Sequence, residues 1–224
     1  MKNLQLLAGS ERAYYLEKFP IDDFFSFDIS PYLEVCQFEK GEWIFQEGSF
    51  PDTMYYMIEG KSKLYVTHKN GKVSLIEYIE APCFMGEIEL LNEGRYTKGI
   101  QTVSKTICLS IAINGCKDKL LADAKFLRRI CVFLGQKQTA MTAKYTQNQV
   151  FPLENRLAAF ILLSSDQGIY KEKHTEICEY LGVSYRHLLY VLAQFCKEAI
   201  LEKTKKGYLI IDEKRLAELA HEIQ

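Results

Sequence analysis

The sequence predicts an α+β protein with three parts: an N-terminal β-sandwich or roll, a long helix, and a C-terminal winged helix-turn-helix. Three observations predict these parts. Short strand-like runs separated by glycines fill residues 32–113, apolar residues recur every seven positions between about 118 and 145, and a helix, a tight turn, a second helix and a hairpin follow over 174–211. We therefore expect domains at 1–118, 119–146 and 147–224.

The composition is that of an ordinary globular protein. The chain has 224 residues, of which 48% are hydrophobic and 25% charged, which is enough for two small cores. No apolar run approaches the roughly 18 residues of a membrane span, and no secretory signal is recognisable, so we expect a cytoplasmic protein. The seven cysteines include no CxxC pair, which favours free buried thiols over disulfides.

The first 113 residues predict a cap followed by the roll. Aromatic residues scattered among polar ones up to about residue 30 predict short helices that pack on the roll. Within the roll, Asn70–Gly71 predicts a two-residue hairpin turn, and Ala81–Leu91 predicts one short helix. The segment Ile100–Ile113 is rich in strand-forming residues and is expected to close the roll.

A heptad repeat predicts a long helix from Asp118 to about Tyr145. One series is Leu120, Leu127, Leu134 and Met141, and the other is Ala124, Cys131, Gln138 and Tyr145. We interpret them as the seam of a parallel homodimer, with the interface residues Leu120, Leu127, Cys131, Leu134 and Met141. A helix packed on its own roll is the alternative. Pro152 ends this helix and marks a domain boundary.

The segment His174–Leu192 predicts two helices joined by a sharp turn. Ile177 and Leu181 bury one face of the first helix, Gly182 permits the turn, and Ser184 is a good cap for the second helix. The first turns of the second helix then expose the donors that reading of a DNA major groove requires. The candidate base-contacting residues are Tyr185, Arg186, His187 and Tyr190. An ordinary αα-corner with a solvated polar face is the alternative.

A basic hairpin follows the second helix. Leu201–Lys203 and Tyr208–Ile211 are expected strands, and Thr204–Gly207 is the turn between them. From Lys171 to Arg215 the chain has nine Lys and Arg against seven Asp and Glu, a net charge of +2, which permits nucleic-acid binding without requiring it. The candidate phosphate-contacting residues are Thr175, Ser184, Lys203, Lys205 and Lys206.

Five motifs occur in a fixed order along the chain. They are Gly41–Gly48, a hairpin at Tyr55–Gly60, Gly86–Leu91, the helix Asn155–Leu163 and Gly182–Arg186. Together they resemble the Crp/Fnr superfamily of bacterial transcription regulators, and within it the YeiL-like branch. The resemblance implies an N-terminal sensory roll that is a double-stranded β-helix of the jelly-roll, cyclic-nucleotide-binding-like type. It further implies a dimerising helix and a winged helix that binds a two-fold symmetric DNA operator. It also implies RNA polymerase and a small-molecule or redox effector as partners.

The resemblance also suggests where an effector would bind. In members of the superfamily that bind cyclic nucleotides, a Gly-Glu pair holds the ribose and an Arg-Ser pair holds the cyclic phosphate. Lys98 and Gly99 stand at the second pair here, and they lack both the guanidinium fork and the hydroxyl, which argues against a cyclic nucleotide. The candidate effector-binding residues are Gly86, Glu87, Ile88, Lys98 and Gly99, although Glu87 has the alternative role of capping the short helix. Scattered cysteines argue against an iron–sulfur cluster.

Other functional classes find little support in the sequence. The roll region has one histidine, His68, and the chain contains no HExxH, P-loop or GxGxxG motif, so we expect neither an enzyme nor a metal site. The remaining alternative is a regulatory module that acts through protein partners. The sequence thus predicts a homodimeric, sequence-specific DNA-binding transcription regulator whose roll senses an unidentified effector.

Overall fold

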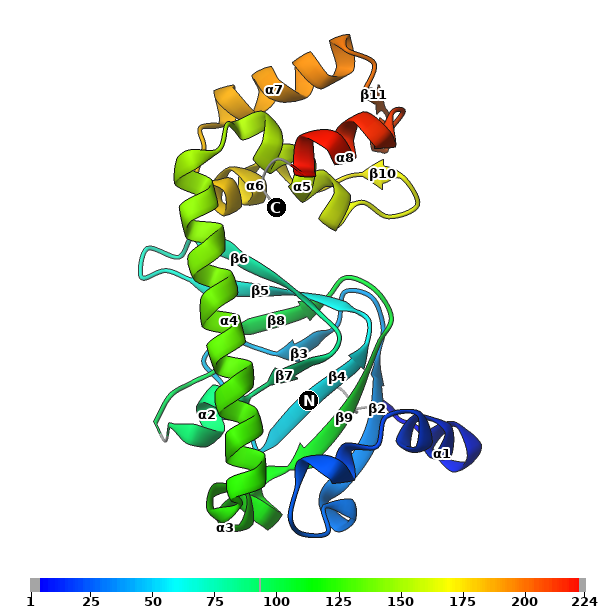
Figure 1. The fold of residues 1–224 in the computed structure, drawn as a ribbon, viewed down its shortest axis with the longest axis vertical. Coiled ribbons are helices and arrows are strands. Elements are labelled where there is room, and N and C mark those ends of the chain that lie inside the picture. Colours follow the sequence, from blue (N-terminus) through cyan, green and yellow to red (C-terminus); the bar gives the residue numbers. More distant parts are fainter. Residues whose placement is uncertain (1–4, 93, 222–224) are drawn as a thin grey trace. The chain divides into compact units, whose positions relative to one another are not determined.

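The computed structural model describes residues 5–92 and 94–221, which form two compact units (Figure 1). The first unit is Met1–Gln136 and the second is Lys137–Gln224. Helix α4, Ala124–Val150, begins in the first unit and ends in the second. The division therefore falls inside this helix and not at its C-terminal end.

The first unit is a roll of two antiparallel sheets, as predicted. One sheet has the strand order β1-β2-β9-β4-β7 and the other has the order β3-β8-β5-β6. The strands are β1 Gln5–Leu6, β2 Leu33–Phe38, β3 Trp43–Phe45, β4 Thr53–Glu59, β5 Lys61–Thr67, β6 Val73–Glu80, β7 Cys83–Met85, β8 Gly99–Thr102 and β9 Thr106–Ala112. The helices are α1 Gly9–Lys18, α2 Glu87–Leu91 and α3 Ile113–Ala122, with 3₁₀ turns at Ile21–Phe24 and Ser30–Tyr32.

The space between the two sheets is filled by aromatic and aliphatic side chains. The ring of Tyr55 lies 5.7 Å from that of Phe38 and 5.4 Å from that of Phe45, measured between centroids. The other members of this inner core are Cys36, Ile44, Met57, Ile79, Met85, Ile100 and Cys108. Both sheets contribute to it, so the inner core joins them.

A second core covers the opposite face of the five-stranded sheet. Met54 and Ile58 of β4 belong to it, because successive residues of a strand point to opposite faces. The N-terminal cap and helices α3 and α4 complete this outer core, in which the rings of Phe25 and Phe126 stack with centroids 5.3 Å apart. The described part of the cap therefore packs on the roll, as expected.

The predicted long helix is interrupted at Asp123. Helix α3 ends at Ala122 and α4 begins at Ala124. The Asp123 carboxylate accepts hydrogen bonds from the Ser26 N–H at 2.8 Å, the Ser26 hydroxyl at 2.7 Å and the Lys125 N–H at 3.0 Å, so it caps α4. The prediction of a single helix beginning at Asp118 was therefore wrong. The apolar residues keep their seven-residue spacing across Asp123, so this spacing does not reveal a break of one residue.

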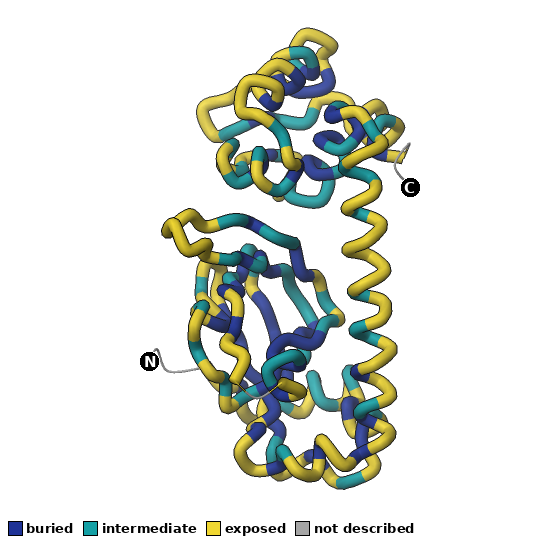
Figure 2. The backbone as a smooth tube through the Cα atoms, turned by 90° about the vertical axis from the view of Figure 1, so that its left-hand side faces the viewer, coloured by how far each residue is buried: buried dark blue, intermediate teal, exposed yellow. Residues whose placement is uncertain are grey.

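The break changes the interpretation of the dimer seam. Leu120 lies in α3 and is fully buried in the outer core, so its assignment to a dimer interface was wrong. Leu127 and Leu134 are half-buried and pack against the same core. Cys131 and Met141 are exposed, and Figure 2 shows that most of α4 beyond its first turns is exposed.

Three predicted connections of the roll differ from the structure. Residues 68–72 connect β5 to β6, and the His68 N–H donates to the Lys72 carbonyl at 2.8 Å, so this turn is wider than two residues. Tyr55–Gly60 is no hairpin, because β4 and β5 belong to different sheets. At Gly60 φ is +107° and a Cβ would lie 2.5 Å from Thr106 Oγ1, so only glycine fits. The segment expected to be one helix contains strand β7 before α2.

The second unit is a winged helix-turn-helix, as predicted. Its helices are α5 Leu153–Ser164, α6 His174–Leu181, α7 Tyr185–Lys197 and α8 Glu213–His221, and its strands are β10 Ile169–Tyr170, β11 Leu201–Thr204 and β12 Gly207–Ile210. The strand order is β10-β12-β11, and the two residues of β10 are too few for a sequence pattern to reveal. Throughout residues 5–92 and 94–221, no helix is both long and apolar enough to span a bilayer.

Replacing Asp123 with Ala should lower the free energy of unfolding by about 1–3 kcal/mol, because Ser26 and the first amides of α4 lose their acceptor. Burial raises the pKa of the Asp123 carboxyl, but the hydrogen bonds from Ser26 and from the Lys125 amide outweigh it and hold the pKa below its usual value. The stabilisation is therefore complete above about pH 4 and is lost as the pH falls through the folded-state pKa.

Urea unfolding followed by the fluorescence of Trp43, the only tryptophan, measures this effect. The exposed residue Asp118 in α3 provides the control variant Asp118→Ala. An equal loss of stability in the control, or a difference between wild type and Asp123→Ala that does not shrink toward about pH 3, would contradict the assignment.

Candidate nucleic-acid interface

The turn between α6 and α7 is built from local hydrogen bonds. Gly182 adopts a φ of +64°, and the Val183 N–H donates to the Cys178 carbonyl at 2.9 Å, which closes the end of α6. The Ser184 hydroxyl accepts a hydrogen bond from the His187 N–H at 3.2 Å. Ser184 is therefore the N-cap of α7, as its position in the sequence predicts.

The two helices bury one face and expose the other. The buried side chains are Ile177, Leu181, Leu188, Val191, Leu192 and Phe195. Tyr185, Arg186, His187 and Tyr190 are all exposed, and Tyr190 is 65% exposed. The structure therefore brings the four candidate base-contacting residues together on the outer face at the start of α7.

Leu189 belongs to the same outer face and was not identified from the sequence. Its side chain is 38% exposed, although leucine in an amphipathic helix usually indicates the core. Its position in the sequence could have identified it as exposed. Leu189 directly follows the buried residue Leu188 and therefore lies about 100° further around the helix. An exposed aliphatic side chain beside hydrogen-bond donors is suited to contact with a thymine methyl group.

His174 is a second residue whose position the sequence did not reveal. Its ring lies 6.0 Å from that of Tyr185 and 6.1 Å from that of Tyr208, so it joins the start of α7 to the β-hairpin. Burial, and then the positive charge of Lys203, lower the pKa of His174, which favours the neutral imidazole. His174 therefore contributes packing to this surface and little charge near neutral pH.

The β11–β12 hairpin forms a basic wing with a fixed turn. The Thr204 hydroxyl donates to the Gly207 carbonyl at 3.0 Å and accepts from the Lys206 N–H at 3.2 Å. The three candidate phosphate-contacting lysines, Lys203, Lys205 and Lys206, are exposed, and so is Thr175 in the first turn of α6. Nucleic-acid phosphates are the partners that such a lysine-rich tip fits.

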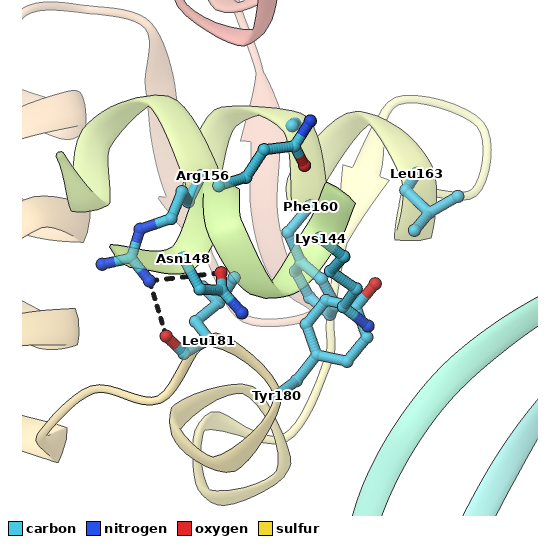
Figure 3. A pocket seen from close by; sticks show the side chains of 9 residues that line it. Lys144, Asn148, Arg156, Phe160, Leu163, Tyr180 and Leu181 are labelled. Carbon is cyan, nitrogen blue, oxygen red and sulfur yellow. Dashed lines mark hydrogen bonds between the residues drawn. The ribbon is translucent and has the colours of Figure 1, made fainter. Parts of the chain in front are cut away.

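Arg156 connects the end of α4 to the helix-turn-helix, as Figure 3 shows. Its Nη1 donates to the Leu181 carbonyl at 2.6 Å and to Asn148 Oδ1 at 3.4 Å, and its Nε donates to the Phe151 carbonyl at 3.0 Å. Leu181 is the last residue of α6, so the guanidinium satisfies one of the carbonyls that a helix end leaves unpaired.

A cation–π contact forms a second link between the same two helices. The Lys144 ammonium of α4 lies 3.4 Å from the centroid of the Tyr180 ring of α6. Lys144 and Tyr180 also line a small pocket of about 110 Å³ beside Arg156 (Figure 3). The helix-turn-helix is thus held to the last turns of α4 at two points.

The candidate effector-binding residues at the end of β7 lie in and around α2. Gly86 is the N-cap of this helix and Glu87 is its first residue. The side chain of Glu87 is buried and that of Ile88 is half-buried. A role for Glu87 in starting α2, the alternative considered from the sequence, agrees with this position.

The candidate effector-binding residues at the start of β8 are held by other neighbours. Lys98 is exposed, with its Nζ 3.8 Å from Glu47 Oε1. Gly99 lies beneath Trp43, where an added Cβ would be 2.9 Å from the indole ring. The close packing of the Trp43 indole is therefore sufficient to explain why residue 99 is a glycine.

These residues do not fit a cyclic nucleotide. A cyclic phosphate requires convergent donors, yet the ammonium of Lys98 lies near Glu47 and Gly99 offers no hydroxyl. The space between the sheets is occupied by the rings of Phe38, Phe45 and Tyr55. We therefore derive no role for such a ligand in this roll.

Two cysteines of the roll, Cys36 and Cys108, are buried thiols, whereas Cys83 is partly exposed. Cys36 of β2 lies opposite Cys108 of the neighbouring strand β9, and the Cys36 thiol donates a hydrogen bond to the Cys108 carbonyl at 3.4 Å. Burial raises the pKa of Cys36 to about 12. Among the residues that the structure describes, no three His, Cys, Asp or Glu side chains gather as metal ligands would. Cys36 is therefore protonated at neutral pH and is a poor nucleophile and metal ligand.

Comparison with known proteins shows the family. Residues 35–121 match the family model of the cyclic nucleotide-binding domain, and residues 155–219 match that of the Crp-like helix-turn-helix domain. The regulatory protein YeiL of Escherichia coli O157:H7 is 47% identical over 201 residues, which cover 90% of this chain and 92% of that protein. The chain belongs to the Crp/Fnr family of transcription regulators. It is therefore a regulator with a helix-turn-helix DNA-binding domain, and not an enzyme, as the sequence motifs predicted.

More distant members of the Crp/Fnr family agree with this assignment. A CRP-like cAMP-activated global transcriptional regulator from Mycobacterium tuberculosis is 20% identical over 202 residues, covering 86% of this chain and 90% of that protein. A crystal structure of a crp/fnr-family regulator from Eubacterium rectale superposes with a TM-score of 0.75 at 18% identity, covering 92% of this chain and 99% of that chain. A CRP/FNR-family regulator from Thermus thermophilus has a TM-score of 0.65 at 20% identity, with coverages of 84% and 98%. The two structures show the shared fold.

Replacing Arg156 with Lys keeps the charge but removes the guanidinium fork, so the second unit should lose about 1–3 kcal/mol of stability. Trp43 lies in β3 of the first unit, so its fluorescence transition in urea should not move. The loss of helical circular dichroism should shift to lower urea concentration. Arg215→Lys is the control, because Arg215 is exposed and its guanidinium donates to Glu218 on the same helix. Equal shifts in both variants would contradict the anchoring role.

Proposed function

We propose that this protein is a cytoplasmic, homodimeric, sequence-specific regulator that binds a two-fold symmetric operator and acts with RNA polymerase. The observation that supports operator binding is the exposed outer face of α7, which carries Tyr185, Arg186, His187 and Tyr190 beside the basic wing. Membership of the Crp/Fnr family supports the same proposal. The roll is the part proposed to sense a small-molecule or redox effector.

The proposed roles divide between base reading and phosphate contact. Arg186 lies in the first turn of α7, and it is proposed to donate two hydrogen bonds to guanine O6 and N7 in the major groove. Tyr185, His187 and Tyr190 flank it. Thr175, Ser184 and the wing lysines Lys203, Lys205 and Lys206 are proposed to contact phosphates, which fix the orientation of α7 without reading sequence.

The proposed dimer forms along the exposed face of α4. Cys131, Gln138 and Tyr145 recur every seven residues on this face, and Tyr145 is 65% exposed. Met141 beside them is 44% exposed. Apolar side chains along an exposed helix lower their free energy by packing against a second copy, and the heptad spacing fits a parallel pair. Two symmetric copies of α7 would then reach successive major grooves about 34 Å apart.

Arg186→Ala should weaken binding to the preferred operator at least about 30-fold while leaving binding to random duplex nearly unchanged, because the residue reads a base in each of the two half-sites and each contact contributes about 1–3 kcal/mol. The operator comes from selection among random duplexes, and fluorescence anisotropy at several salt concentrations gives both affinities. Lys205→Ala is the matched control and should weaken both affinities together and reduce the salt slope by about 1.8, because one phosphate contact is lost in each protomer of the dimer. No enriched sequence, or equal losses for Arg186→Ala on both duplexes, would contradict the proposed reading.

Met141→Glu should raise the dissociation constant of the dimer at least about tenfold, because it places two carboxylates in the seam. Sedimentation velocity over a range of protein concentrations measures the constant. Ala143→Glu is the control, since Ala143 is also exposed but lies about 200° further around α4. Leu127→Glu is unsuitable because Leu127 packs on the protein's own core. A dimer unaffected by Met141→Glu would remove this face from the proposal.

A further inference from the structure

A pocket of about 520 Å³ lies in the first unit beside α4. It is lined by aromatic side chains from both the roll and the helix. The rings of Tyr56 and Phe84, on neighbouring strands, have centroids 4.6 Å apart, and the ring of Phe133 on α4 lies 5.5 Å from that of Phe84. The volume is within the range of about 300–1,000 Å³ that is usual for small-molecule sites.

Positive charge surrounds this aromatic lining. Lys125, Arg128 and Arg129 line the pocket with one acidic residue, Asp23, which gives a net charge of +2. Two of the cations are positioned by the cap: the Lys125 ammonium donates to the Phe25 carbonyl at 3.1 Å, and the Arg129 guanidinium lies 3.6 Å from the centroid of the Phe24 ring.

Arg128 differs from the other two cations of the pocket. Within residues 5–92 and 94–221, it forms no ion pair and no side-chain hydrogen bond, and it is exposed. A guanidinium in this state retains all of its donors for a ligand. Because it stands beside Arg129 at an aromatic pocket, a carboxylate placed there would meet two guanidinium groups.

The pocket lies on a different flank of α4 from the proposed dimer seam. Arg128, Val132 and Gln136 line it at four-residue spacing. Around the helix, Arg128 lies about 60° from the seam residue Cys131, whereas Gln136 lies about 160° from the seam residue Gln138, so the row turns away from the seam along α4. Dimerisation through the seam therefore leaves the Val132 and Gln136 side of the pocket accessible. The interior of the roll offers less room, since the inner core fills it.

We propose that this pocket binds a small organic anion that carries an aromatic ring. The ring stacks against Tyr56, Phe84 and Phe133, and the anionic group accepts hydrogen bonds from Arg128 and Arg129. The aromatic lining selects for the ring and the net positive charge selects for the anion. The further step, that the bound anion is the effector of a DNA-binding regulator, rests on the proposed function.

The binding test uses 8-anilinonaphthalene-1-sulfonate, an anionic aromatic dye whose fluorescence rises in an apolar site, with the full-length chain and no DNA. We expect one saturable site that phenylacetate displaces and that uncharged phenylacetamide does not. Arg128→Ala should weaken dye binding at least about tenfold. Val132→Trp, which narrows the pocket without changing charge, should also weaken it. Arg95→Ala is the control, because Arg95 is exposed and lies outside the pocket.

Three results would overturn this inference. They are an absence of saturable dye binding, equal affinities for wild type and Arg128→Ala, and displacement by phenylacetamide as effective as displacement by phenylacetate. Dye binding that occurs only in the dissociated Met141→Glu variant would also overturn it, because a second copy of the chain would then occupy the pocket. Since no DNA is present, failure of dye binding is distinguishable from failure of operator binding.

Discussion

The rest of the structure depends on one constraint, which is that α4 is buried along only a short part of its length. Of its 27 residues, only Phe126 and Ile130 are fully buried. Helices in proteins gain most of their stability from packing, so a long exposed helix needs anchors at its ends and a partner along its side. Asp123 and the outer core anchor its start, and Arg156 and Tyr180 contact its last turns. The uncovered face of α4 is the reason that we propose a second copy of the chain as its partner.

Because α4 is only partly buried, its different faces have different neighbours. Phe126 and Ile130 face the outer core, Cys131 and Gln138 face the proposed partner, and Arg128 faces the aromatic pocket. These directions differ because each residue turns about 100° from the one before it. A helix with three distinct flanks can be stable, dimeric and in contact with a ligand at once, which a fully buried helix cannot.

Sequence reasoning succeeded where the determining contacts are local. The turn at Gly182, the cap at Ser184 and the outer face of α7 all follow from spacing within about twenty residues, and the structure has them in place. It failed where distant segments decide. The break in the helix at Asp123 depends on the hydrogen bond from Ser26. The need for glycine at position 60, between β4 and β5, comes from the nearby Thr106. The aromatic pocket unites Asp23, Tyr56, Phe84 and Arg128, which no periodicity connects.

Helix α4 is the segment of the chain that begins in the first unit and ends in the DNA-binding unit. It lines the pocket at Arg128 and Gln136, and at Asn148 it contacts the arginine that holds the end of α6. A ligand changes the equilibrium between two conformers only by its difference in affinity for them, about 1.4 kcal/mol for each tenfold preference. Arg128 is exposed and has no charged partner among the described residues, so movement of α4 relative to the aromatic lining would change its distance from a bound anion directly. The pocket is thus placed where differential affinity can arise, which binding at the packed inner core would not allow.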